Sequence, residues 1–195
     1  MVIKKYEGNY QGEKITLEII PDEYPENPRE EWDNIGTMVC FHKRYSLGDE
    51  NHNIESDWFF SWEEMEKYLY KKIDAGIVLP LYLYDHSGIT ISTSPFSCSW
   101  DSGQVGFIYV TKQKIRKEFN KKRISKKLLE KVKKILISEV NIYDQFLRGD
   151  IYSFLLKSNG EIIDSCHGFY GHDIRENGML DHIPEEYRKA IAMKI

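Results

Sequence analysis

Residue types that perform nucleophilic and acid–base chemistry gather between residues 79 and 110. His86 lies in the segment DHSG, and Cys98 and Asp101 lie in the loop SPFSCSWDSG. A thiolate nucleophile needs a base within hydrogen-bonding distance, and only folding could bring a histidine that close to Cys98. Asp85, His86 and Ser87 are adjacent in sequence, so their side chains diverge and cannot relay a proton as a triad. Asp, Ser and Gly are typical of tight turns, which is the interpretation we favour for DHSG.

A second group of reactive residues lies in CHGFYGHD, residues 166–173. Its candidate metal ligands are Cys166, His167, His172 and Asp173, all of residue types that bind zinc. Their spacing matches no established ligand pattern, and strand alternation sends Cys166 and His167 to opposite faces. The segment is therefore either a metal site or a strand with one residue in the core and one on the surface. An enzyme would join it to the Cys98 loop across one sheet, with catalytic candidates His86, Cys98, Asp101, Cys166 and His167.

The composition excludes several classes of protein. Hydrophobic residues make up 41% of the 195 residues and charged residues 30%, which is typical of a globular chain. Apolar runs are shorter than the roughly 18 residues that span a bilayer, and the N-terminal residues lack the apolar core of a signal peptide. The three widely spaced cysteines favour reduced thiols. We therefore expect no membrane segment, no cofactor and a cytoplasmic location.

Charge is distributed unevenly along the chain. Residues 112–134 contain twelve Lys or Arg and two acids, so they carry +10, while the whole chain carries −4 and the remainder −14. These cations are either the solvated side of an amphipathic helix or a binding surface. A solvated side usually mixes signs as Glu–Lys pairs, so the excess favours an anionic partner, either nucleic acid or an acidic protein. The predicted contact residues are Lys121, Lys122, Arg123, Lys126, Lys127, Lys131, Lys133 and Lys134.

Part of the opposite charge lies in residues 18–33, which hold seven acids and the single cation Arg29. Three prolines interrupt this stretch and predict a loop. We favour a solubilising loop on composition. The alternative is a surface that mimics nucleic-acid phosphates and competes for a nucleic-acid-binding protein.

Periodicity predicts the elements that position these residues. Alternating apolar residues predict strands at 4–8, 14–20, 36–45, 79–84, 89–93 and 103–110, and a late hairpin that turns at Asn159-Gly160. Ser61 and Glu64 form a capping box before a helix that ends by Gly76. Apolar residues at helical spacing predict a long amphipathic helix over 125–147, with lysines on its opposite side. Shorter helices follow residue 110 and begin at residue 184.

The element order defines the expected fold class. Tight hairpins imply antiparallel pairing, so we expect an α+β fold: an antiparallel sheet built from hairpins, with the long helix and shorter helices packed on one face. The length suits a single domain over residues 1–195, with room for a small acidic N-terminal lobe, about 1–75, packed on a core of 76–195.

Three strings carry a resemblance to a known family: LPLYLYDHSGITISTSPFSCSWDSGQVGFIYV, YDQFLRGDIYSF and DSCHGFYG. They span residues 79–171 and resemble a family of small bacteriophage and prophage proteins without a settled biochemical function. The resemblance implies a phage accessory protein in the cytoplasm of a bacterial host. Proteins of that kind frequently bind and modulate host enzymes or anti-phage defence systems. The resemblance transfers no catalytic residue.

These observations favour a binding protein over an enzyme. The leading hypothesis is a phage-encoded inhibitor that binds a host or defence macromolecule through its basic helix surface. The first alternative is a hydrolase or nucleotide-processing enzyme that uses the cysteines and histidines or a metal. The second alternative is a protein that binds nucleic acid directly, although no nucleic-acid-binding fingerprint accompanies the lysines.

Overall fold

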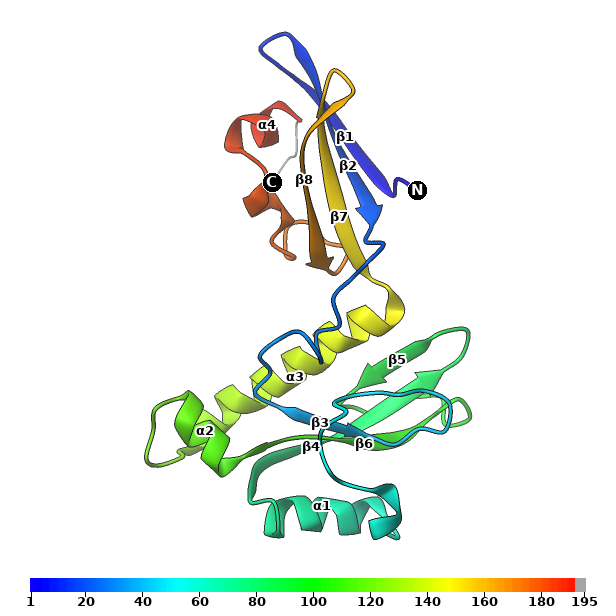
Figure 1. Ribbon diagram of the computed structural model, residues 1–195, viewed down its shortest axis with the longest axis vertical. Helices are drawn as coiled ribbons and strands as arrows, with labels where there is room; N and C mark the ends of the chain where they lie inside the picture. The colour runs from blue at the N-terminus through cyan, green and yellow to red at the C-terminus, as the bar shows by residue number, and fades with distance from the viewer. Residues whose placement is uncertain (192–195) are drawn as a thin grey trace. The chain divides into compact units, whose positions relative to one another are not determined.

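The chain folds into two compact units in a computed structural model that describes residues 1–191 (Figure 1). One unit combines residues 1–26 with residues 149–191, and we call it the terminal unit. The other, residues 27–148, is the central unit. This division differs from the single domain that we expected. The lobe boundary expected near residue 75 falls inside the central unit, where a strand begins.

The terminal unit contains a four-stranded antiparallel sheet in the order β1-β2-β7-β8. Its strands are β1 (Lys4–Tyr10), β2 (Glu13–Pro21), β7 (Ile151–Ser158) and β8 (Glu161–Tyr170). The predicted turn at Asn159-Gly160 is confirmed: φ is 50° and 93° at these residues, as a type I′ hairpin requires. β2 pairs with β7, so residues far apart in sequence build one sheet.

The core of the terminal unit lies on one face of this sheet. Alternate residues of β2 and β7, such as Leu17 and Phe154, pack with Met179 of the 3-10 helix η2 (Met179–His182). The short helix α4 (Glu185–Ala190) runs against β1 at Gly8, where a Cβ would lie 1.8 Å from the carbonyl oxygen of Ala190. Glycine is therefore required at this position, since no side chain fits between the strand and the helix.

The central unit contains a second four-stranded antiparallel sheet, in the order β3-β6-β4-β5. Its strands are β3 (Thr37–Cys40), β4 (Ala75–Asp85), β5 (Ile89–Ser92) and β6 (Ser102–Thr111). The 3-10 helix η1 (Ser56–Trp58) and the helices α1 (Trp62–Lys71), α2 (Lys112–Glu118) and α3 (Lys126–Arg148) complete the unit. The α+β class and the long amphipathic helix are thus confirmed.

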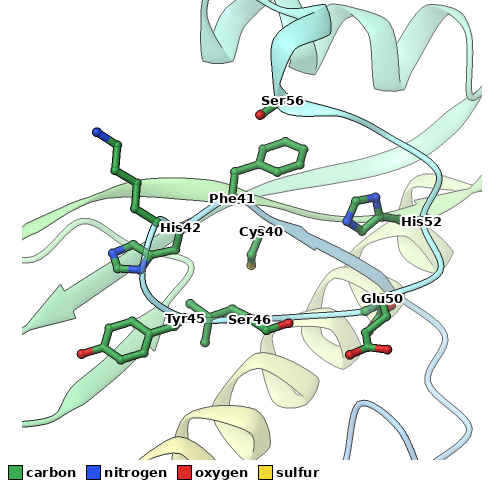
Figure 2. A pocket seen from close by; sticks show the side chains of 11 residues that line it. Cys40, Phe41, His42, Tyr45, Ser46, Glu50, His52 and Ser56 are labelled. Atoms are coloured by element: carbon green, nitrogen blue, oxygen red, sulfur yellow. The ribbon is translucent and has the colours of Figure 1, made fainter.

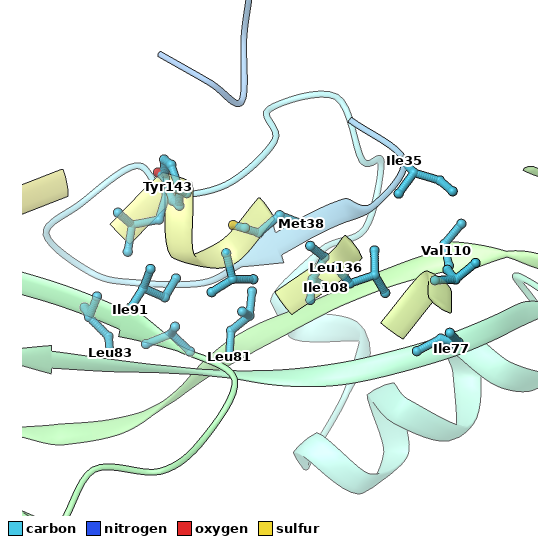
Figure 3. Packing of buried hydrophobic residues seen from close by; sticks show 14 of the residues in the cluster. Ile35, Met38, Ile77, Leu81, Leu83, Ile91, Ile108, Val110, Leu136 and Tyr143 are labelled. Atoms are coloured by element: carbon cyan, nitrogen blue, oxygen red, sulfur yellow. The ribbon is translucent and has the colours of Figure 1, made fainter. Parts of the chain in front are cut away.

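Helices cover both faces of the central sheet, whereas the sequence predicted cover on one face (Figure 1). On one face, Leu136 and Tyr143 of α3 pack with Met38, Leu81 and Ile108 (Figure 3). On the other face, α1 packs on the alternate strand residues. The physical reason is that residues 105–110 of β6, VGFIYV, form a nearly continuous apolar run, and a strand that is apolar on both faces is stable only when both faces are covered.

A buried ion-pair network anchors α3 to the start of β3. The side chain of Arg29 is 1% exposed and donates to Asp49 through Nε at 2.7 Å and through Nη2 at 2.8 Å. It also donates to Glu139 of α3 at 3.2 Å and to the carbonyl oxygen of Gly36 at 2.9 Å. Glu139 in turn accepts the N–H groups of Ile35 at 2.7 Å and Gly36 at 3.0 Å. The position of α3 is therefore fixed by buried polar contacts as well as by apolar packing.

Candidate functional site

Five of the eight predicted contact cations line one hollow of the central unit, with a volume of about 720 Å³. The hollow lies where the connection between α2 and α3 meets the first turns of α3. We call it the basic pocket, and its residues are Phe119, Lys121, Arg123, Ser125, Lys127, Leu128, Lys131 and Lys134. The other three predicted cations, Lys122, Lys126 and Lys133, are exposed outside the pocket. The structure therefore divides the predicted contact residues into five cations that line the pocket and three lysines that lie outside it.

Helical geometry explains this division. The hydroxyl of Ser125 accepts a hydrogen bond from the N–H of Leu128 at 3.2 Å, which caps α3 beside the pocket. With 3.6 residues per turn, Lys127, Lys131 and Lys134 recur on one side of the helix. Lys126 and Lys133 each precede a pocket lysine by one residue. They therefore lie about 100° away from it around the helix axis, outside the pocket.

The pocket cations form no close ion pair in the part of the chain that the structure describes. In residues 1–191, none of the eight predicted cations has a carboxylate oxygen within 4.0 Å. Earlier lysines of the same charge run do have partners, since Lys112 pairs with Asp74 at 2.5 Å and Lys114 donates to the carbonyl oxygen of Asn34 at 2.8 Å. The cations of α2 are thus partly paired inside the fold, whereas those of the pocket make no ion pair within residues 1–191.

The pocket also has an aromatic wall. The ammonium of Lys131 lies 5.1 Å from the ring centroid of Phe119, within the range of a cation–π contact. Phe119 also packs against the apolar cluster beneath α3, which holds its ring in place. The pocket therefore combines several positive charges with one fixed aromatic surface.

The structure brings together three catalytic candidates of the central unit. Nδ1 of His86 lies 3.3 Å from Oδ2 of Asp101, and the thiol of Cys98 donates to the same oxygen at 3.7 Å. The carboxylate thus lies between the imidazole and the thiol. In a nucleophilic triad the imidazole is in the middle, because it must remove the proton from the nucleophile. This order does not form a thiol–imidazole nucleophile.

The segment DHSG is a turn, as we predicted. Ser87 has φ of 57° and Gly88 has φ of 143°, between β4 and β5. Asp85 pairs with Arg44 and also accepts a hydrogen bond from the hydroxyl of Tyr45 at 3.3 Å. Asp85 is therefore occupied by a neighbouring loop and does not orient His86.

The residues of CHGFYGHD are not assembled into a site. The thiol of Cys166 donates to the carbonyl oxygen of His167 at 3.8 Å, and Nδ1 of His167 lies 3.9 Å from Asp22. Nδ1 of His172 is 4.0 Å from Asp150, and no group of three metal-competent side chains occurs within residues 1–191. Asp173 instead accepts the N–H of a following residue in a turn.

The expectation that the Cys98 loop and CHGFYGHD share one sheet is wrong. β8, which carries Cys166 and His167, belongs to the sheet of the terminal unit. The Cys98 loop lies between β5 and β6 of the other sheet. Hairpin patterns predicted both strand pairs, but they did not tell which hairpins share a sheet.

The acidic stretch is divided between the two units after residue 26. Glu18 lies in β2 and pairs with Lys157 at 2.7 Å, while Asp22 accepts the N–H of Gly168 at 2.8 Å. Arg29, the one cation of the stretch, is buried in the network that anchors α3. Several charges of this stretch are therefore structural, which a purely solubilising loop would not require.

A pocket of about 660 Å³, lined by residues between Cys40 and Ser56, was not predicted from the sequence. Figure 2 shows His42 and His52 on opposite sides of Cys40 in that view. Nδ1 of His42 accepts the N–H of Arg44 at 3.3 Å, and Nδ1 of His52 accepts the N–H of Ile54 at 3.1 Å. The feature of the sequence that could have indicated this pocket is a pair of histidines on either side of a loop that contains Gly and Asn.

The chemistry of this second pocket is limited by burial. Burial, followed by the nearby Asp49 carboxylate, raises the pKa of Cys40 to about 12, so its thiol stays protonated at neutral pH. Burial also lowers the pKa of His52 and keeps its imidazole neutral. The pocket can donate and accept hydrogen bonds, but a protonated thiol is a poor nucleophile.

Comparisons with known proteins do not assign a family. Protein-family models, curated proteins and solved structures give no match to the chain. Within residues 1–191, every helix is too short or too polar to cross a bilayer.

Proposed function

We propose that this chain is a binding protein whose basic pocket holds a polyanionic macromolecule. The observation that carries the proposal is the convergence of five cations on one hollow where, within residues 1–191, none of them has a carboxylate oxygen within 4.0 Å. Like charges that line one hollow repel one another, and a bound polyanion adds attraction to each of them. Release of counter-ions from the polyanion adds a favourable, salt-dependent contribution to binding.

The arrangement of the reactive residues supports binding over catalysis. Asp101 separates His86 from the thiol of Cys98, and Cys40 is held protonated by burial. A partner in an infected bacterial cell is part of this proposal, and it rests on the resemblance to small bacteriophage and prophage proteins that we expect for residues 79–171. In this proposal the protein is a phage accessory protein that binds a host or defence macromolecule.

The experiment compares two triple variants of equal charge change. K127E/K131E/K134E reverses the pocket lysines, and K122E/K126E/K133E reverses the exposed lysines outside the pocket. Binding of each protein to heparin, used as a generic polyanion, is measured over a series of salt concentrations. If the pocket is the site, its variant reduces the slope of log affinity against log salt by about three, one per lost cation.

The outer variant is the control for net charge, because both variants change the protein by the same amount. We expect it to retain most of the affinity and most of the salt slope. Equal losses in the two variants would refute a localised site, because they would show that heparin senses only the overall charge. Co-purification from phage-infected cells with the wild type and the pocket variant then tests whether a cellular partner depends on the same lysines.

A further inference from the structure

We infer that the polyanion held by the basic pocket is single-stranded nucleic acid, with phosphates on the cations and a base against Phe119. The inference rests on the proposed function, since it names the class of ligand for the same pocket. Three features of the central unit carry it: the concave shape, the fixed aromatic ring and the spacing of the lysines on α3.

The concave shape favours a single strand over a duplex. A helix that reads duplex DNA enters the major groove as a ridge, with its side chains projecting from a convex surface. Here the cations surround a hollow of about 720 Å³, a volume within the range of pockets for small ligands. A nucleotide of a single strand can enter such a hollow, whereas a base pair inside a duplex cannot leave the helix without being unstacked.

The aromatic ring favours nucleic acid over an acidic protein. Phe119 lines the same hollow as the cations and lies under the ammonium of Lys131. Proteins that bind single strands combine a positively charged groove with aromatic side chains on which bases stack. A carboxylate-rich protein surface would use the lysines but would gain little from the ring. Leu128 adds a further apolar contact surface in the pocket.

The spacing of the lysines suits a closely charged strand. Lys127, Lys131 and Lys134 span about 10 Å along α3, given a rise of 1.5 Å per residue. Each strand of a double helix carries a phosphate about every 3.4 Å along the axis, so a single strand that keeps this stacked form would place about three phosphates along the three lysines. Lys121 and Arg123 place two more cations on the other wall, from the α2–α3 connection.

The test measures binding of four probes by the wild type and by variants of Phe119. The probes are a fluorescent oligothymidylate of about 12 nucleotides, a duplex of the same length, heparin and polyglutamate, and the length follows the usual site size of single-strand binders. F119L removes the ring and keeps an apolar side chain. F119W keeps an aromatic ring and adds a tryptophan fluorophore inside the pocket. Thermal unfolding of each variant reports whether the central unit is folded.

The wild type is expected to bind the oligothymidylate more tightly than the duplex. F119L should weaken binding of the oligothymidylate by about 5- to 150-fold, the usual cost of losing one stacked base, and leave heparin binding unchanged. F119W should retain affinity, and the oligothymidylate, but not heparin, should quench its additional emission. This last measurement keeps the test valid if F119L unfolds.

Tighter binding of the duplex, or binding of polyglutamate without the oligothymidylate, would overturn the inference. So would an F119W emission that the oligothymidylate leaves unchanged. These failures differ from failure of the proposed function. If heparin affinity still depends on the pocket lysines, the polyanion site stands and only the ligand class is wrong. If the two triple lysine variants weaken heparin binding equally, the proposed site itself is wrong.

Discussion

Removal of the buried guanidinium of Arg29 should destabilise the central unit strongly. R29M keeps an unbranched side chain of similar length but deletes two contacts to Asp49, one to Glu139 and one to the carbonyl oxygen of Gly36. Two partly buried carboxylates then lose their cation. Breaking a buried ion pair by removing one partner costs about 3–5 kcal/mol, because the remaining charge stays desolvated. We expect a loss of this size in the free energy of unfolding.

The pH dependence of this loss separates electrostatics from packing. Burial raises the pKa of Glu139, whereas Arg29 opposes that rise in the wild type. In R29M the folded-state pKa of Glu139 therefore rises further above its unfolded value. As the pH falls, the Glu139 carboxyl is therefore protonated in the folded state before it is protonated in the unfolded state. The deficit of R29M relative to the wild type should then shrink as the pH falls from about 7 to about 5.

Denaturant unfolding at both pH values measures these differences. R44M is the matched control, because Arg44 pairs with Asp85 while its own side chain is 68% exposed. An exposed pair of this kind contributes about 0–1 kcal/mol. The reasoning is refuted if R29M costs no more than R44M. It is also refuted if the cost of R29M is the same at both pH values, because lost packing alone does not depend on pH.

Three further predictions concern single residues of the central unit. G106A should be strongly destabilising in thermal unfolding, since its Cβ would lie 1.9 Å from the carbonyl oxygen of Val39. G103A, where no atom lies within 4 Å of the added Cβ, should have little effect, and equal effects of the two variants would contradict the close packing of β3 on β6. Cys40, whose pKa burial raises to about 12, should resist iodoacetamide at about pH 8 until the protein unfolds, as peptide mass spectrometry would show. His52, whose pKa burial lowers, should titrate in NMR spectra below the usual midpoint of a histidine, and its contribution to stability should be lost as the pH falls through that range. A normal midpoint would contradict its burial.

Local patterns in the sequence determined the elements of this protein. The apolar period of residues 125–147 predicted α3, which runs from Lys126 to Arg148, because side chains on a helix must recur every 3.6 residues to share one face. Ser61 predicted the start of α1, and its side chain accepts the N–H of Glu64. Asn159-Gly160 predicted a hairpin, because both residues tolerate positive φ. The charge of the basic segment was also evident from the sequence alone.

Only the tertiary structure decided how these elements are combined. The pairing of β2 with β7 creates the terminal unit. The alternation of apolar residues within a strand does not specify which distant strand will pair with it. Arg29 looked like one cation in a solvated acidic loop, but long-range packing buries it against Glu139 of α3. The eight basic residues had the same appearance in sequence, yet the meeting of α3 with the α2–α3 connection gathers five and leaves three outside. Composition fixes how much charge a segment carries, whereas the distances that turn charges into a site arise from the fold.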